Sequence, residues 1–210
     1  MSPGEPKFRR RKADRPDEIL AAALSVFAER GFAAAKLDHI AARAGVSKGA
    51  LYLYFATKEE LFLAVVDQAV APDLRRIGEL AANHPGPFPD LARAVAELAP
   101  QVLARPEIGG VMKMIIGEAR NFPSLARIWH DRVITPALEA LAGAIAAAQA
   151  RGEIRAGDPR LYAVGFIGPL LAGLIWRETF VPVGAHPFDL SSLARQHVET
   201  ALRGMMESEP

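Results

Sequence analysis

One short segment combines cationic, aromatic and small residues in a pattern that suits binding to DNA. On a helix from Lys48 to Phe55, Leu51 and Phe55 share one side, which leaves Lys48, Tyr52 and the backbone near Gly49 on another. A lysine can reach a base edge or a phosphate, and a tyrosine hydroxyl can bond a phosphate. A glycine lets the backbone approach a duplex closely. The chemistry expected of this face is nucleic-acid binding rather than catalysis.

The elements that position this face form a helix-turn-helix. Ile40, Ala41 and Ala44 have the three-to-four spacing of one helix face, and Gly45 follows where a left-handed residue can end that helix. Ser47 can then cap the next helix through its side-chain oxygen. Two helices at a steep angle with a glycine in the turn are typical of the helix-turn-helix, whose second helix enters the major groove of DNA.

This region resembles the TetR family of transcriptional repressors. The resemblance is carried by AGVSKGALYLYFATKEEL at residues 44–61, together with Gly31-Phe32 and Ile40-Ala41, about a quarter of the chain. It implies an all-α protein with an N-terminal three-helix helix-turn-helix DNA-binding domain. It also implies a C-terminal helical domain for ligand binding and dimerisation, with about nine helices in all.

The resemblance, the basic cluster of the arm and the position of Lys58 at a helix N-terminus together indicate a set of DNA contacts in the first quarter of the chain. These residues are Arg10, Arg11, Lys36, Ser47, Lys48, Gly49, Tyr52, Tyr54 and Lys58. Core packing with a hydrated hydroxyl is the alternative for the two tyrosines. Lys36 and Ala50 stand where the family usually has threonine or serine. The docking mode can therefore be carried over from the family, whereas the base preference cannot.

Charge separates the same quarter from the rest of the chain. Residues 1–57 hold ten lysines and arginines against six acidic residues, although the net charge of all 210 residues is only +1. A basic first quarter on a mildly acidic body indicates a polyanion partner for that quarter alone. Residues 1–13 are expected to be a flexible basic arm that orders on DNA, or else a solvated tail.

Caps and helix breakers divide the chain into helical segments, and no strand-like alternation is found. A helix from Pro16 to Arg30 completes a DNA-binding domain at 14–57. Thr57 and Glu60 form a capping box that starts the next helix, so a helical regulatory domain is expected at 58–210. Its helices are expected at 58–82 with a bend or interruption at Pro72, 89–103, 107–120, 124–151 with Pro136 inside, 159–180 and 189–206.

Two observations bear on the cellular compartment. The chain has no cysteine, which fits a reducing cytoplasm, and its N-terminus lacks the apolar core of a secretory signal. The longest apolar run, Leu161 to Trp176, is shorter than the roughly 20 residues of a membrane-spanning helix. We therefore expect a cytoplasmic protein in which this run is a buried helix.

In a TetR-like protein the C-terminal helices form a ligand pocket and a dimer interface. The residues expected at a pocket for a hydrophobic small-molecule effector are Met112, Ile115, Glu118, Phe122, Trp129, Tyr162, Phe166 and Trp176. Ordinary core packing is the alternative for each of them. The residues expected at the interface of a homodimer are Gly165, Gly168, Ala172 and Leu193, because small side chains permit close helix contact.

No catalytic, metal or cofactor site is expected. The five histidines lie far apart in the sequence, and the motifs of nucleotide binding and nucleophilic catalysis are missing. The sequence favours a homodimeric repressor released from a palindromic double-stranded DNA operator by a hydrophobic effector. Two alternatives stay open. One is a helix-turn-helix protein whose body only dimerises or recruits a protein partner, and the other is an all-helical enzyme with an incidental helix-turn-helix.

Overall fold

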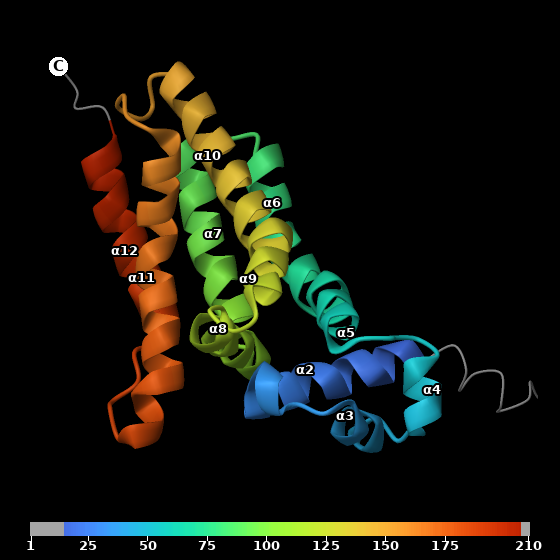
Figure 1. Ribbon diagram of the computed structural model, residues 1–210. Helices are drawn as coiled ribbons and strands as arrows, with labels where there is room; N and C mark the ends of the chain where they lie inside the picture. Colours follow the sequence, from blue (N-terminus) through green and yellow to red (C-terminus); the bar gives the residue numbers. More distant parts are fainter. Residues whose placement is uncertain (1–14, 207–210) are drawn as a thin grey trace, which may run out of the picture.

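The structure is a computed structural model that describes residues 15–206, and these form a small helical unit below a taller helical body (Figure 1). The small unit contains α2 (Arg15–Ala34), α3 (Leu37–Arg43) and α4 (Lys48–Tyr52). No β-strand occurs between residues 15 and 206. The all-α fold with an N-terminal helix-turn-helix is therefore confirmed. The domain boundary between residues 57 and 58 stays a prediction.

The small unit is built on a kinked first helix. α2 continues past the expected end at Gly31, whose φ of 75° and ψ of 169° interrupt the helix and suit glycine alone. Beyond the kink, Phe32 turns back into the core, where its ring stacks on Phe27 at a centroid distance of 5.5 Å. Phe62 packs edge-on against both rings, so the same aromatic cluster joins the small unit to the next helix.

The helix-turn-helix is formed by the local signals that the sequence contains. Gly45 takes a φ of 66° between α3 and α4. The Ser47 side chain accepts a hydrogen bond from the backbone N–H of Ala50 at 3.2 Å and so caps α4. Ala41 and Leu51 are buried between the two helices and α2. Because Leu51 anchors one side of α4 in the core, the opposite side of the helix is held facing solvent.

A long interrupted helix connects the small unit to the body. It consists of α5 (Lys58–Val65), a π-helical turn η1 (Val66–Val70) and α6 (Ala71–Asn83). The Thr57 hydroxyl accepts from the N–H of Glu60 at 3.1 Å, and the Glu60 carboxylate accepts from Ala56 at 2.9 Å. The predicted capping at Thr57 is thus present, with the return bond made one residue earlier than in a standard capping box.

A second interrupted helix follows the same plan. α9 (Pro123–Trp129), the π-helical turn η2 (His130–Ile134) and α10 (Thr135–Ala150) form one path, and Pro136 follows its π turn as Pro72 follows η1. Proline has no N–H and its ring crowds the carbonyl four residues back, which a wider π turn relieves. The disturbance expected at Pro72 therefore takes the form of a π turn, and a second π turn precedes Pro136, which was expected to lie inside one long helix.

The remaining helices complete the body. They are α7 (Phe88–Leu103), α8 (Pro106–Glu118), α11 (Pro159–Thr179) and α12 (Leu190–Met205), with a short 3-10 turn η3 (Val181–Val183) after α11. α6 packs along α10, α10 along α11, and α12 along both α7 and α11. α8 lies across α2 and is the principal contact between the body and the small unit (Figure 1).

Two stretches, Pro123–Ala150 and Pro159–Val183, are long and apolar enough to cross a membrane by length and composition alone. Both contribute fully buried residues, such as Ile145 and Leu174, to the core shared with the other helices. Only 28% and 22% of the two apolar windows are buried within the chain. The run from Leu161 to Trp176, expected to be a buried helix, is therefore buried on one side and exposed on the other, as at Leu161 and Val164. A core helix passes the same test of length and composition, so the test is weak evidence for a membrane span.

Candidate nucleic-acid interface and ligand cavity

The outer face of α4 carries exposed residues of the predicted DNA surface. Ser47, Lys48 and Gly49 are exposed at its N-terminal end. Tyr52 and Tyr54 are 45% and 39% exposed, which argues against the alternative of core packing. No described atom lies within 4 Å of the position that a Cβ on Gly49 would take, so the space beside its backbone is open.

Lys48 is held by an ion pair within the helix-turn-helix. Its Nζ lies 2.9 Å from Oδ1 of Asp38 on α3 and 6.0 Å from the ring centroid of Tyr52. The hydrogen bond to Asp38 raises the pKa of Lys48 because it stabilises the charged ammonium. Both members of the pair are exposed, so the lysine can exchange this carboxylate for a phosphate.

The other predicted cations divide into three groups. Lys36 is exposed at the N-terminus of α3, on the approach to the same surface. Lys58 instead donates to the backbone carbonyls of Phe32, Ala33 and Ala35, at 2.5, 3.4 and 3.1 Å. These bonds give the Lys58 ammonium a structural role, so we do not carry it into the proposed DNA surface. Arg10 and Arg11 lie outside the described residues.

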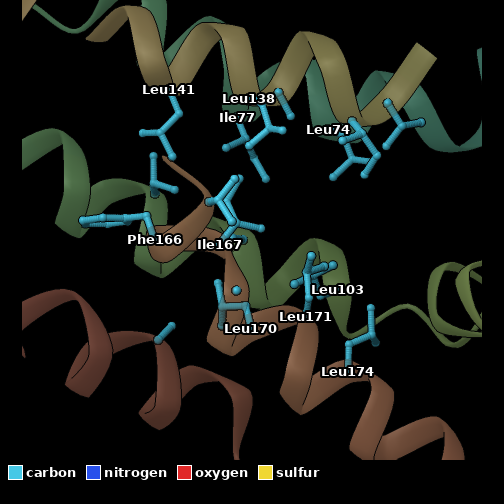
Figure 2. Close-up of a pocket in the computed structure, with 18 of the residues that line it drawn as sticks. Leu74, Ile77, Leu103, Leu138, Leu141, Phe166, Ile167, Leu170, Leu171 and Leu174 are labelled. Carbon is cyan, nitrogen blue, oxygen red and sulfur yellow. The ribbon is translucent and has the colours of Figure 1, made fainter. Parts of the chain in front are cut away.

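The body contains a partly open cavity of about 240 Å³ between α6, α7, α8, α9, η2, α10, α11 and α12. Figure 2 shows Leu138 and Leu141 of α10 facing Ile167 and Leu171 of α11 across it. Apart from His197 and Trp129, every lining residue has a hydrocarbon or thioether side chain or none at all. The Nε2–H of His197 donates to the carbonyl of Gly165 at 3.1 Å, so one of its two ring nitrogens is already partnered. The cavity therefore suits an apolar molecule.

Three of the eight residues expected at a ligand pocket line this cavity, namely Met112, Trp129 and Phe166. The other five lie elsewhere and leave the proposed site. Ile115 is buried in the core outside the cavity wall, and Phe122 packs on Phe32 at 5.1 Å. Tyr162 accepts a hydrogen bond from Arg155 at 3.1 Å.

The remaining two residues expected at the pocket but absent from the cavity wall are Glu118 and Trp176. Glu118 points to the small unit, where its carboxylate accepts hydrogen bonds from the backbone N–H groups of Phe32 and Ala33. Trp176 lies against Phe180 and Phe188, and its indole N–H donates to the carbonyl of His186 at 2.9 Å. Each of these side chains has partners that residue type alone did not reveal.

The lining residues that sequence reasoning missed come mainly from α6 and α10. Leu74 and Ile77 of α6 lie on the same side of the cavity as Leu138 of α10, opposite Ile167 and Leu171 of α11 (Figure 2). Their spacing on each helix marks a buried face. The same spacing is produced by solid core packing, so it gives no signal for a void.

Two of the four residues predicted at a dimer interface, Gly165 and Ala172, lie on the outward side of α11. Gly165 and Ala172 are exposed, and they alternate with Leu161, Val164 and Ile175, which are 71%, 53% and 41% exposed. Gly168 borders this stripe and also lines the cavity. Leu193 of α12 is half-buried against Gly173 and belongs to the contact between α11 and α12 within the chain.

An exposed helix-turn-helix beside a helical body with an apolar cavity is typical of an all-helical class of DNA-binding regulators. The profile described as "Bacterial regulatory proteins, tetR family" matches residues 19–65. The profile described as "AefR-like transcriptional repressor, C-terminal domain" matches residues 89–207. The chain belongs to the TetR family of transcriptional regulators. Its family consists of regulators, so the alternative of an all-helical enzyme is set aside.

Two curated relatives illustrate the match. The chain is 31% identical over 154 residues to the HTH-type transcriptional repressor BepR of Brucella suis, covering 70% of this chain and 73% of BepR. It is 51% identical over 57 residues to the HTH-type transcriptional activator FasR of Mycolicibacterium smegmatis, covering 27% of this chain and 26% of FasR. The similarity to FasR thus spans about a quarter of either protein.

Solved structures show the same fold over at least 90% of the chain. A TetR-family regulator from Mesorhizobium loti is 27% identical, with a TM-score of 0.75 over 94% of this chain and 99% of that one. SmeT in complex with triclosan is 23% identical, with a TM-score of 0.76 over 92% of each chain. FadR of Bacillus subtilis in complex with stearoyl-CoA is 22% identical, with a TM-score of 0.71 over 90% of this chain and 98% of that one.

Proposed function

We propose that this chain is a homodimeric, cytoplasmic repressor that leaves a palindromic DNA operator when an apolar small molecule enters its body. The observation that carries the proposal is the apolar cavity, which lies in the body while the exposed face of α4 lies in the small unit. A protein whose body only dimerised or recruited a partner would have no need of an internal cavity of about 240 Å³.

The DNA surface consists of the outer face of α4 with its flanking residues. Lys48 and Tyr52 lie where a recognition helix would meet base edges, and Tyr54 and Lys36 lie where phosphates would pass. Ser47 and Gly49 bring the backbone at the start of α4 close to the duplex. Arg10 and Arg11 of the basic arm add phosphate contacts that strengthen binding at low salt.

The effector is a neutral molecule, or one whose polar group remains outside the cavity. A charge buried without a partner is strongly unfavourable, and the only polar groups of the lining side chains are the indole of Trp129 and the imidazole of His197, whose Nε2 is already bonded. The triclosan bound by SmeT and the stearoyl-CoA bound by FadR both contain a substantial apolar part, which supports the same class of effector.

The dimer forms through the outward stripe of α11. Large apolar side chains alternate there with Gly165 and Ala172, so two copies of the helix can approach each other closely across a two-fold axis. An exposed apolar stripe of this kind is unfavourable in a monomer and marks an interaction surface. Pairing would place two α4 helices on successive turns of the same DNA face.

Selection of bound duplexes from a random DNA pool tests the dimeric DNA-binding mode. The expected product is a palindrome whose half-sites lie about one helical turn apart, bound by two chains per duplex in analytical ultracentrifugation. Recovery of an asymmetric site bound by a single chain would contradict the homodimer.

A further inference from the structure

The turn between α2 and α3 is held on two sides by residues distant in sequence. The carboxylate of Glu118, at the C-terminal end of α8, accepts the backbone N–H of Phe32 at 2.9 Å and of Ala33 at 2.7 Å. From the other side, the ammonium of Lys58 donates to the carbonyls of Phe32, Ala33 and Ala35. The peptide groups just before α3 are therefore bonded to the body through Glu118 and to α5 through Lys58.

The kink at Gly31 explains why these N–H groups need an acceptor from outside. The positive φ of Gly31 interrupts α2, so the next two N–H groups lose the helical carbonyls that they would otherwise meet. A carboxylate satisfies both at once with short, charge-assisted bonds. A Cβ on residue 31 would collide with the Glu118 carboxylate, so glycine is needed here for space as well as for its φ.

The helix that carries Glu118 also lines the cavity. Ile108 and Met112, in the first part of α8, belong to the cavity wall. Met112 and Glu118 are six positions apart, which corresponds to about 9 Å of helix that moves as a stiff unit. α8 also packs closely on α2 at Gly110. A Cβ added to Gly110 would lie only 2.7 Å from the Cβ of Ala28. A displacement of α8 is thus passed on to the turn.

We infer that Glu118 is the positioning residue through which occupancy of the cavity changes the placement of the DNA-binding helices. The inference rests on the proposed function for its effect on DNA. Hydrogen bonds weaken steeply with distance and angle, so a shift of about 1 Å at Glu118 releases the N–H groups of Phe32 and Ala33. The effector stabilises the released state and DNA the bonded state, which makes their binding mutually antagonistic.

Hydrogen exchange on the full chain without DNA tests this connection directly. The probe is N-phenyl-1-naphthylamine, a neutral dye that fluoresces in apolar surroundings. Saturating dye should speed the exchange of the Phe32 and Ala33 amides about tenfold in the wild type, because charge-assisted bonds are lost. The matched control Glu139→Gln, on the exposed side of α10, should behave as the wild type does.

In Glu118→Gln the same two amides should exchange fast from the outset, and dye should add less than about twofold. The dye affinity itself should stay within about twofold of the wild type, because Glu118 does not line the cavity. Glu118→Asp, which keeps the charge but is one methylene shorter, should also lose the response. Unchanged amides in the dye-bound wild type, or a full dye response in both variants, would overturn the inference.

Titration of selected DNA with and without dye separates this inference from the proposed function. Dye should weaken DNA binding by the wild type by about 5-fold to 150-fold, and by less than about twofold in Glu118→Gln. If dye leaves wild-type DNA binding unchanged while the amides respond, ligand-released repression fails and the connection from cavity to turn stands. If dye weakens DNA binding equally in the wild type and in Glu118→Gln, ligand-released repression is supported and the role of Glu118 is refuted.

Discussion

The ammonium of Lys48 lies 2.9 Å from Oδ1 of Asp38, so an ion pair joins the two helices of the helix-turn-helix on the surface proposed to face DNA. The pair holds Lys48 over the edge of Tyr52 and keeps it charged, since the bond to Asp38 raises its pKa. A phosphate arriving at this surface meets a positioned cation and, next to it, a carboxylate that repels it. The two residues should therefore affect DNA affinity in opposite directions.

Lys48→Ala should weaken DNA binding about tenfold at fixed salt, because it removes a base or phosphate contact. Asp38→Asn should strengthen binding severalfold, because it releases the lysine and removes a like charge from the phosphates. Fluorescence anisotropy with a labelled duplex measures both, and Glu139→Gln on α10 serves as the control for loss of an acid elsewhere. Equal affinities for the wild type and Lys48→Ala would remove Lys48 from the interface.

A larger side chain inside the cavity should weaken ligand binding without lowering the stability of the fold. Ala99 of α7 lines the cavity and is almost fully buried, so Ala99→Leu places three more carbon atoms in the void. Affinity for N-phenyl-1-naphthylamine should fall about tenfold, while the melting temperature stays equal or rises, because a filled void restores packing contacts. The control Ala146→Leu adds the same atoms to the exposed side of α10 and should leave dye binding unchanged. Normal dye affinity in Ala99→Leu would place the dye elsewhere.

A charge on the outward stripe of α11 should dissociate the dimer. Ala172 is exposed in the single chain, so Ala172→Arg can fold normally but would bury two arginines across a two-fold axis. The dimer dissociation constant in sedimentation equilibrium should rise about 100-fold or more. Ala146→Arg on α10 is the matched control and should remain dimeric. A dimer of unchanged affinity in Ala172→Arg would exclude this stripe from the interface.

Glu153 makes stability depend on pH through the N-terminus of α7. Its carboxylate pairs with Arg151 at 2.6 Å and accepts the backbone N–H of Phe88 at 2.6 Å. These two bonds, the arginine first, lower the pKa of Glu153 below its ordinary value of 4.5. Its contribution to stability is therefore complete above pH 4.5 and is lost as the pH falls through the lowered pKa of the folded chain.

Glu153→Gln should accordingly lower the free energy of unfolding by about 1 kcal/mol at neutral pH, on the scale of a lost helix cap. The difference from the wild type should shrink as the pH falls below 4.5, because the wild-type carboxylate becomes protonated. Urea unfolding at several pH values measures the difference. A gap that stays constant down to the acid limit would mean that the ionised carboxylate contributes nothing.

Much of the fold could be predicted because its signals are local. Gly45, Ser47 and Thr57 act on backbone groups within a few residues, so the ends of α3, α4 and α5 follow from the sequence. Pro72 marked a correct place of disturbance, whereas Pro136 was expected to lie inside one long helix. Their resolution as π turns could not be predicted, because it depends on how the connector and the second interrupted helix pack together, with Asp67 and Arg132 paired at 3.7 Å between them.

The cavity was less predictable, because residue type does not tell which side of a helix faces it. α11 is apolar on its buried side and on its outward side, so Phe166 and Trp176 looked equivalent in the sequence. Phe166 lines the cavity, whereas Trp176 turns to the cluster with Phe180 and Phe188. Only packing between distant helices decides between these sides.

Glu118 shows the same limit for polar groups. Its type suggested a polar contact inside a pocket, yet its partners are N–H groups about 85 residues earlier in the chain. The available signal was at Gly31, since a glycine that interrupts a helix leaves two N–H groups in need of an acceptor. The sequence shows that need but not which carboxylate meets it.

The antagonism between effector and DNA is the central claim, and one titration tests it most directly. The DNA affinity of the wild type is measured at increasing concentrations of N-phenyl-1-naphthylamine. It is then measured in the same way with a series of methyl esters of saturated fatty acids that displace the dye. We predict that every compound that displaces the dye weakens DNA binding, by about 5-fold to 150-fold at saturation, and that DNA weakens dye binding by the same factor. Compounds that fill the cavity and leave DNA affinity unchanged would contradict ligand-released repression.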